Sequence, residues 1–83
     1  MTKLTNPLEI SEYKQRWMRE GSHSVQIHSD LRHNALTYCK VQMFRQQWVH
    51  RKYTDVYEDT FFFEQLLDAK AFAYYFKEWV IND

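Results

Sequence analysis

Glycine and proline each occur only once in this chain of 83 residues, at Gly21 and Pro7. These two residue types form most flexible linkers, left-handed turns and phosphate-binding loops. With one of each, the chain has neither an interdomain linker nor a glycine-rich nucleotide loop. We therefore predict a single domain over residues 1–83, built from regular helices and strands around one core.

The core has to be held by packing, because Cys39 is the sole cysteine and cannot form an intramolecular disulfide or a cysteine-based zinc cluster. Aromatic residues make up 18% of the chain, and their large side chains let a short chain bury enough apolar surface. The single cysteine favours a reducing compartment. No apolar run has the length of a signal peptide or a membrane span, so we expect a cytoplasmic protein.

The first helix is expected over residues 7–19. Asn6 can cap it, Pro7 suits the first helical position, and Gly21 can end it in a left-handed conformation. Its apolar residues recur at helical spacing, and they are Ile10, Tyr13 and Trp17.

The middle of the chain, residues 22–64, is rich in β-branched and aromatic residues and is predicted to form a sheet. Apolar and polar residues alternate around Val25 and Ile27, and again from Cys39 to Met43, as in half-buried strands. An alternative makes residues 30–52 one helix, since neither glycine nor proline interrupts them. The candidate turns are His33–Asn34, Gln46–Gln47 and Thr54–Asp55.

The last helix is expected over residues 65–80, which carry strong helix formers and no breaker. One broad face is apolar and should face the core; its residues are Leu66, Ala69, Phe72, Ala73, Phe76, Trp79 and Val80. The predicted fold is α+β in two layers, with an N-terminal helix, an antiparallel meander of three or four strands and a C-terminal helix. Trp17 and Phe72 should then lie against the same sheet face.

No residue pattern indicates catalysis or a cofactor. The four histidines, at positions 23, 28, 33 and 50, lack the paired spacing of metal ligands. Cys39 suits a small buried core position better than a nucleophile. We therefore predict a non-enzymatic protein without a metal or other cofactor.

Two surfaces could bind a macromolecule. On the last helix, an apolar stripe lies away from the core face and is flanked by cations, which suits a protein partner or self-association; it comprises Leu67, Ala71 and Tyr74 with Lys70 and Lys77. Alternatively, another segment covers this stripe.

The second surface is the basic segment 31–54, which contains no acid and could bind nucleic acid through phosphate contacts and base stacking. Its candidate residues are Arg45, Trp48, Arg51, Lys52 and Tyr53. The simpler alternative buries these rings in the core and leaves the cations on the solvent face. Residues 55–68 carry five acids and no base, so a cationic surface would be confined to one side.

The segment Asp59–Glu64, followed by Asp68–Phe72, resembles the closing strand and helix of small accessory proteins from large tailed bacteriophages. This resemblance covers the last third of the chain and implies a short, non-enzymatic protein that acts on a host or phage macromolecule. The helix–sheet–helix order is similar to that of double-stranded RNA-binding domains, but the acidic Glu64–Asp68 stands where that family has phosphate-binding lysines. The leading hypothesis is a protein-interaction module, with a viral accessory or regulatory role as its more specific form, and the alternative is a nucleic-acid-binding protein.

Overall fold

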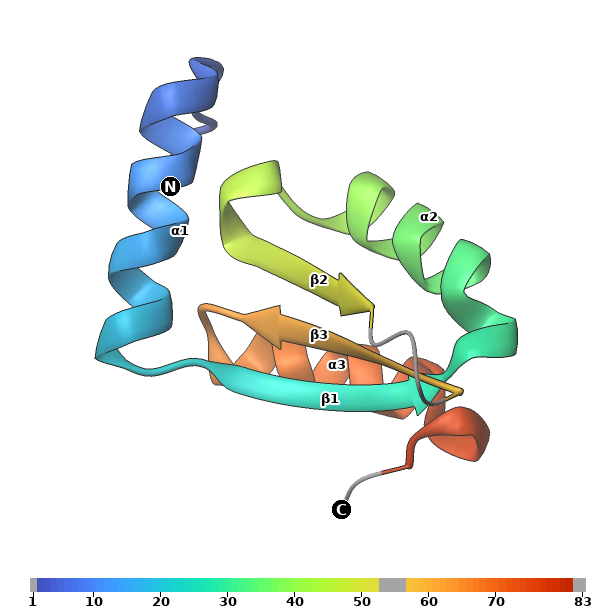
Figure 1. Ribbon diagram of the computed structural model, residues 1–83. Coiled ribbons are helices and arrows are strands. Elements are labelled where there is room, and N and C mark those ends of the chain that lie inside the picture. Colours follow the sequence, from blue (N-terminus) through green and yellow to red (C-terminus); the bar gives the residue numbers. More distant parts are fainter. Residues whose placement is uncertain (1, 53–56, 82–83) are drawn as a thin grey trace.

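The structure, a computed structural model, describes residues 2–52 and 57–81 and confirms an α+β fold with a helix near each end (Figure 1). Three short 3-10 helices, η1 (Ser29–Leu31), η2 (Arg45–Gln47) and η3 (Lys77–Trp79), lie between or after the main elements. The main elements are α1 (Pro7–Glu20), β1 (His23–His28), α2 (Arg32–Gln42), β2 (Trp48–Lys52), β3 (Glu58–Phe63) and α3 (Leu66–Tyr75).

Helix α1 begins where its capping residues place it and ends one residue later than predicted. The Asn6 side chain accepts hydrogen bonds from the backbone N–H groups of Leu8 and Glu9, at 2.9 and 3.4 Å. Gly21 has a φ of 143°, which residues with a Cβ rarely adopt, and its N–H donates to the carbonyl of Trp17. Local signals therefore define this helix at both ends.

The sheet has three antiparallel strands in the order β1-β3-β2, so β3 is central and its two neighbours come earlier in the chain. The expected meander is wrong in this respect, because β1 and β2 are not adjacent. Helix α2 connects them. It replaces the strand predicted around Cys39 and the turn predicted at His33–Asn34. The alternative of a single helix over residues 30–52 is wrong beyond Gln42, because η2 and β2 follow there.

Helix α2 forms because its buried residues have helical rather than strand spacing. Ala35 and Cys39 are four positions apart and both are fully buried, whereas Val41 is exposed. The alternation at residues 39–43 was therefore misleading, since on a helix Cys39 and Val41 lie on opposite sides. The turn predicted at Gln46–Gln47 forms part of η2. The turn predicted at Thr54–Asp55 lies outside the described residues.

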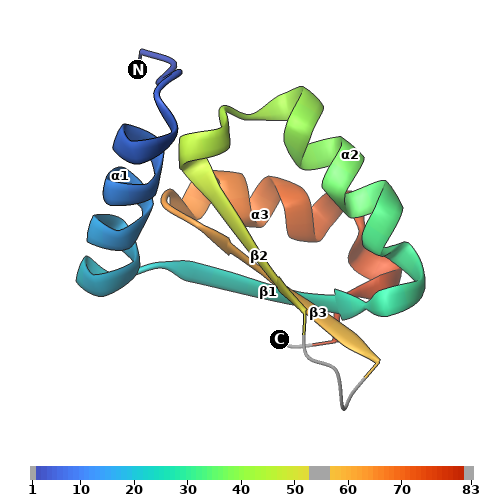
Figure 2. The ribbon, with the colours of Figure 1, turned by 45° about the horizontal axis from the view of Figure 1, so that its top comes forward.

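The core lies between one face of the sheet and the helices α2 and α3, which both lie on that side of the sheet (Figures 1 and 2). Opposite residues of paired strands share a face. The registers Val25↔Phe61 and Trp48↔Phe63 therefore direct these four side chains to the core. Phe72 of α3 lies over the central strand, with ring centroids 5.0 Å from those of Phe61 and Phe63.

Helix α1 does not share this core, contrary to the prediction for Trp17. Trp17 is buried, but its indole N–H donates to the backbone carbonyl of Gln46 in η2, at 2.9 Å. The Tyr13 hydroxyl donates to Glu64 at 2.6 Å, which ties α1 to the connection between β3 and α3. Helix α1 thus lies at one end of the sheet, beside the start of β2 (Figure 1).

The last helix is shorter than predicted, because α3 ends at Tyr75 and η3 follows after Phe76. This change of direction leaves Trp79 43% exposed, and Leu66 at the start of α3 is 48% exposed. Both residues were therefore wrongly assigned to the core face. The chain then runs along the outer edge of β1, where Val80 bridges Ile27 and the Ile81 N–H donates to the Gln26 carbonyl at 2.8 Å.

Candidate functional site

The outer face of α3 carries the apolar stripe predicted from the sequence. Leu67 and Tyr74 are 76% and 75% exposed, and Ala71 between them is exposed as well. Ala69, Phe72 and Phe76 occupy the opposite side of the helix and are buried. Neither α1 nor the described end of the chain covers the stripe, so it is available to a partner.

Apolar exposure is concentrated around this helix. Of nine large hydrophobic residues that are exposed in the described parts of the chain, six lie between positions 66 and 81. Single exposed apolar residues are common, but a group within one short segment is typical of an interaction surface. The six are Leu66, Leu67, Tyr74, Tyr75, Trp79 and Ile81.

Cations flank the stripe, as the sequence predicted. Lys70 and Lys77 are both exposed, and the Lys77 Nζ lies 5.3 Å from the centroid of the Tyr74 ring. Acids lie at the beginning of the helix instead: Asp68 is half-buried, and its pKa is raised by burial and, to a lesser degree, by the charge of Glu64. Helix α3 therefore has an acid in its first turn, and its last turn is followed by Lys77 and the exposed acid Glu78.

Of the two rings in the basic segment that were candidates for stacking on nucleic acid, the structure describes that of Trp48, which is buried. Arg45, Arg51 and Lys52 are exposed, but Trp48 is 8% exposed and the Lys14 Nζ lies 5.6 Å from its ring centroid. Trp48 therefore belongs to the core and offers no open ring. Tyr53 lies outside the described residues.

Strand alternation also separates two of these cations. Trp48 and Lys52 are even-numbered residues of β2 and share the core face, whereas Arg51 points to the opposite face of the sheet. There the Arg51 guanidinium lies 5.9 Å from the centroid of the Phe62 ring. The side chains of Arg51 and Lys52 thus cannot contact one ligand strand on a single face.

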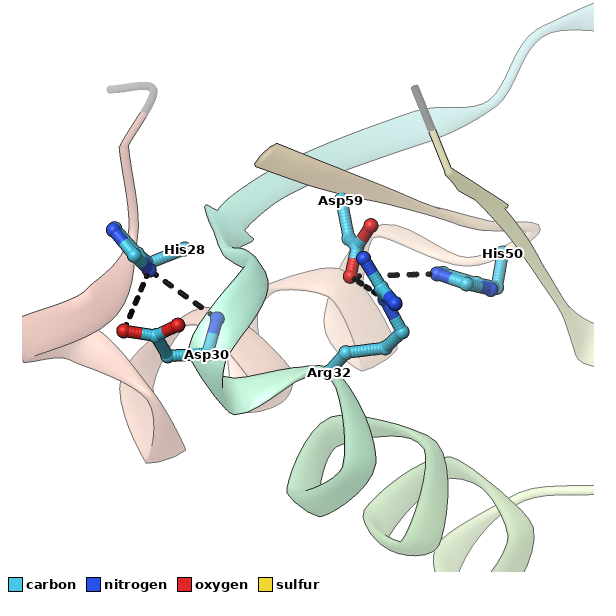
Figure 3. A network of polar contacts seen from close by, with 5 residues as sticks. All are labelled: His28, Asp30, Arg32, His50 and Asp59. Carbon is cyan, nitrogen blue, oxygen red and sulfur yellow. Dashed lines mark hydrogen bonds and ion pairs between the residues drawn. The ribbon is translucent and has the colours of Figure 1, made fainter. Parts of the chain in front are cut away.

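A buried acid that sequence reasoning missed lies on the core face of the sheet. Asp59 of β3 is fully buried, and its Oδ2 accepts a hydrogen bond of 2.5 Å from Arg32 Nε at the start of α2 (Figure 3). The Nε2 of His50 on β2 lies 3.8 Å from the same oxygen. The second carboxylate oxygen, Oδ1, is buried, and no group in the described parts of the chain donates a hydrogen bond to it. This cluster links α2, β2 and β3. Because the Asp59 carboxylate is closed off from solvent, a substrate cannot reach it.

Figure 3 also shows that His28 and Asp30 form a separate pair, with 3.5 Å between His28 Nδ1 and Asp30 Oδ2. Both side chains are largely exposed, so this pair contributes little to stability. Cys39 is buried, and burial raises the pKa of its thiol to about 12, so the reactive thiolate is scarce. Within residues 2–52 and 57–81, no group of three His, Cys, Asp or Glu side chains is arranged to hold a metal ion.

The Asp59 cluster makes stability depend on pH through His50. Burial lowers the pKa of His50 below 6.5, outweighing the Asp59 carboxylate, which raises it; Arg32 and Lys52 lower it further. In the unfolded chain His50 takes up a proton near pH 6.5, so below that pH the unfolded state binds more protons. The free energy of unfolding should therefore decrease as the pH is lowered below about 6.5, by at most about 1.4 kcal/mol per pH unit. The decrease ends when the pH is low enough for His50 to take up a proton in the folded protein as well.

Urea unfolding followed by tryptophan fluorescence, at about pH 7.5 and about pH 5.5, measures this effect. His50→Gln keeps a polar side chain but cannot titrate. The variant should therefore lose less stability than the wild type over this interval. Equal losses in the two proteins would show that His50 does not carry the dependence.

Comparisons with known protein families, with curated proteins and with solved structures found no match to this chain. Among the helices in the described parts of the chain, none is long and apolar enough to cross a membrane.

Proposed function

We propose that the protein is a non-enzymatic protein-interaction module whose contact surface is the outer face of α3. The observation that carries this proposal is the exposure of Leu67 and Tyr74 on the side of α3 opposite its buried residues. Tyrosine is among the residues that most often dominate binding energy, and leucine adds apolar area. Exposing both to water costs free energy that a partner would recover.

The occupant that this surface fits is a second copy of the chain. Two α3 helices packed antiparallel about a two-fold axis near Ala71 would place Leu67 of each beside Tyr74 of the other. Alanine at the crossing lets the two helices approach closely. The acidic first turn of each helix, with Asp68, would lie near Lys77 of the other. The apolar contacts and the pairing of Asp68 with Lys77 thus both favour the antiparallel arrangement of the two helices.

The double variant Leu67→Asp, Tyr74→Ser should abolish this self-association while the fold is kept. Leu67 is in the first turn of α3, where an acidic residue suits the positive end of the helix dipole, and both positions are exposed. Sedimentation velocity over a concentration series should show a dissociation constant raised by about 100-fold or more.

The matched control is Leu8→Asp, which introduces the same charge at an exposed position in the first turn of α1. It should associate like the wild type, and circular dichroism should show that both variants keep their helix content. A wild-type chain that stays monomeric at every concentration would contradict self-association. If the double variant unfolds, the stripe contributes to folding instead.

The resemblance of residues 59–72 to phage accessory proteins supports a viral accessory or regulatory role for this module. A dimer of such small domains would present each surface twice, which strengthens binding to a repeated or symmetric target. Nucleic-acid binding is the less favoured alternative, because its stacking mechanism required an accessible ring at Trp48 or Tyr53, and Trp48 is buried.

A further inference from the structure

A groove lies between α1 and β2, well separated in the sequence from the stripe on α3. It encloses about 370 Å³. Lys14, Met18 and Arg19 line it from the helix, and Val49 and Arg51 line it from the strand. Val49 and Arg51 alternate with the core-facing Trp48 and His50, so they lie on the opposite face of the sheet. Figure 2 shows that α2 and α3 lie together on one side of the sheet, which is the core side.

Every charged residue that lines this groove is a cation. In the described parts of the chain, neither Lys14 nor Arg19 nor Arg51 lies within 4.0 Å of a carboxylate oxygen as an ion pair. Lys14 is half-buried, and both its burial and the nearby charge of Arg45 lower its pKa. Acids and bases balance over the whole chain, so this excess of positive charge is a local feature of the groove.

Met18 and Val49 supply apolar surface to the groove, and the polar side chains of Ser11 and Gln15 line it as well. Met18 and Val49 are each half-buried, so part of each side chain is open to a ligand. The long side chains of Lys14, Arg19 and Arg51 add aliphatic surface around them. A ligand that carries anionic groups together with one apolar side chain complements this arrangement, because each part meets a matching surface.

We propose that this groove binds an acidic segment of a protein partner. Its carboxylates pair with Lys14, Arg19 and Arg51, and an apolar side chain between them packs against Met18 and Val49. Arg51 is the central residue, since it is exposed and its planar guanidinium can bind a carboxylate through two parallel hydrogen bonds.

Single-stranded nucleic acid fits the groove less well. Base stacking supplies much of the affinity of such ligands, and among the described residues no aromatic side chain lines the groove. The Arg51 guanidinium lies over the ring of Phe62 on the same sheet face. Two apolar side chains with three cations around them also suit a peptide better than a phosphodiester chain.

Fluorescence anisotropy can test this proposal with three labelled probes. The first is a short peptide of alternating glutamate and leucine, the second has glutamine in place of glutamate, and the third is an oligothymidine of similar length. We expect the acidic peptide to bind with an affinity that decreases as the salt concentration is raised, because the contacts are ionic. The glutamine peptide should bind about tenfold more weakly or not at all.

The variants Arg51→Glu and Arg51→Gln separate charge from packing. Each should weaken binding of the acidic peptide by about tenfold or more, with the larger loss for glutamate. Lys52→Glu is the matched control, since Lys52 is an exposed cation on the same strand whose side chain points to the opposite face. It should leave affinity within about twofold of the wild type.

Three outcomes would overturn the proposal: no binding of the acidic peptide, equal losses for the Arg51 and Lys52 variants, or tighter binding of oligothymidine than of the peptide. The glutamine substitution keeps the test decisive if the glutamate variant fails to fold. The α3 double variant should bind the acidic peptide normally, so failure here and failure of self-association are distinguishable.

Discussion

Replacing Phe72 with alanine is expected to lower the free energy of unfolding by about 3–5 kcal/mol. Phe72 is fully buried, and its ring contacts the rings of Phe61 and Phe63 on the central strand and of Phe76 on its own helix. Its removal leaves a cavity at the contact between α3 and the sheet. For a domain of this size, whose total stability is of the order of 5–10 kcal/mol, the loss is large.

Urea denaturation monitored by circular dichroism measures the change, and the midpoint should fall without a large change in slope. The control is Tyr74→Ala on the same helix, because Tyr74 is exposed and should change monomer stability by less than about 0.5 kcal/mol. If Phe72→Ala and Tyr74→Ala cost the same, Phe72 does not lie in the core and the placement of α3 is wrong.

Replacing Asp59 with alanine should cost about 3 kcal/mol of unfolding free energy. The substitution removes the hydrogen bond from Arg32 and leaves that guanidinium without a carboxylate at a position where its side chain is 32% exposed. Partial access to water keeps the expected loss at the lower end of the range for broken buried ion pairs. The start of α2 also loses its link to the central strand.

The double variant Asp59→Leu, Arg32→Met tests whether the unpaired charge causes this loss. Apolar side chains of similar size remove both charges, so the double variant should be more stable than Asp59→Ala. Asp30→Ala is the surface control, since Asp30 pairs with His28 in water, and it should cost less than about 1 kcal/mol. Equal stability of Asp59→Ala and the double variant would contradict this explanation.

The candidate surfaces differ in how far the sequence could predict them. The stripe of Leu67, Ala71 and Tyr74 followed from helical spacing alone, because all its residues lie on one helix. The cationic groove could not be predicted in this way, since Lys14 and Arg51 come from different elements. Trp48 was a candidate surface residue because its neighbours are basic, with burial in the core as the simpler interpretation, and the register with Phe63 directs it to the core.

By itself, the sequence determined the elements whose signals are local. Asn6, Pro7 and Gly21 define α1 within one residue, since caps and stops act over a single turn. Tertiary structure decided strand order, the helical state of Arg32–Gln42 and the burial of Asp59. These depend on contacts between residues far apart in the chain, such as Arg32 with Asp59, and their free energies outweigh the small differences in local propensity.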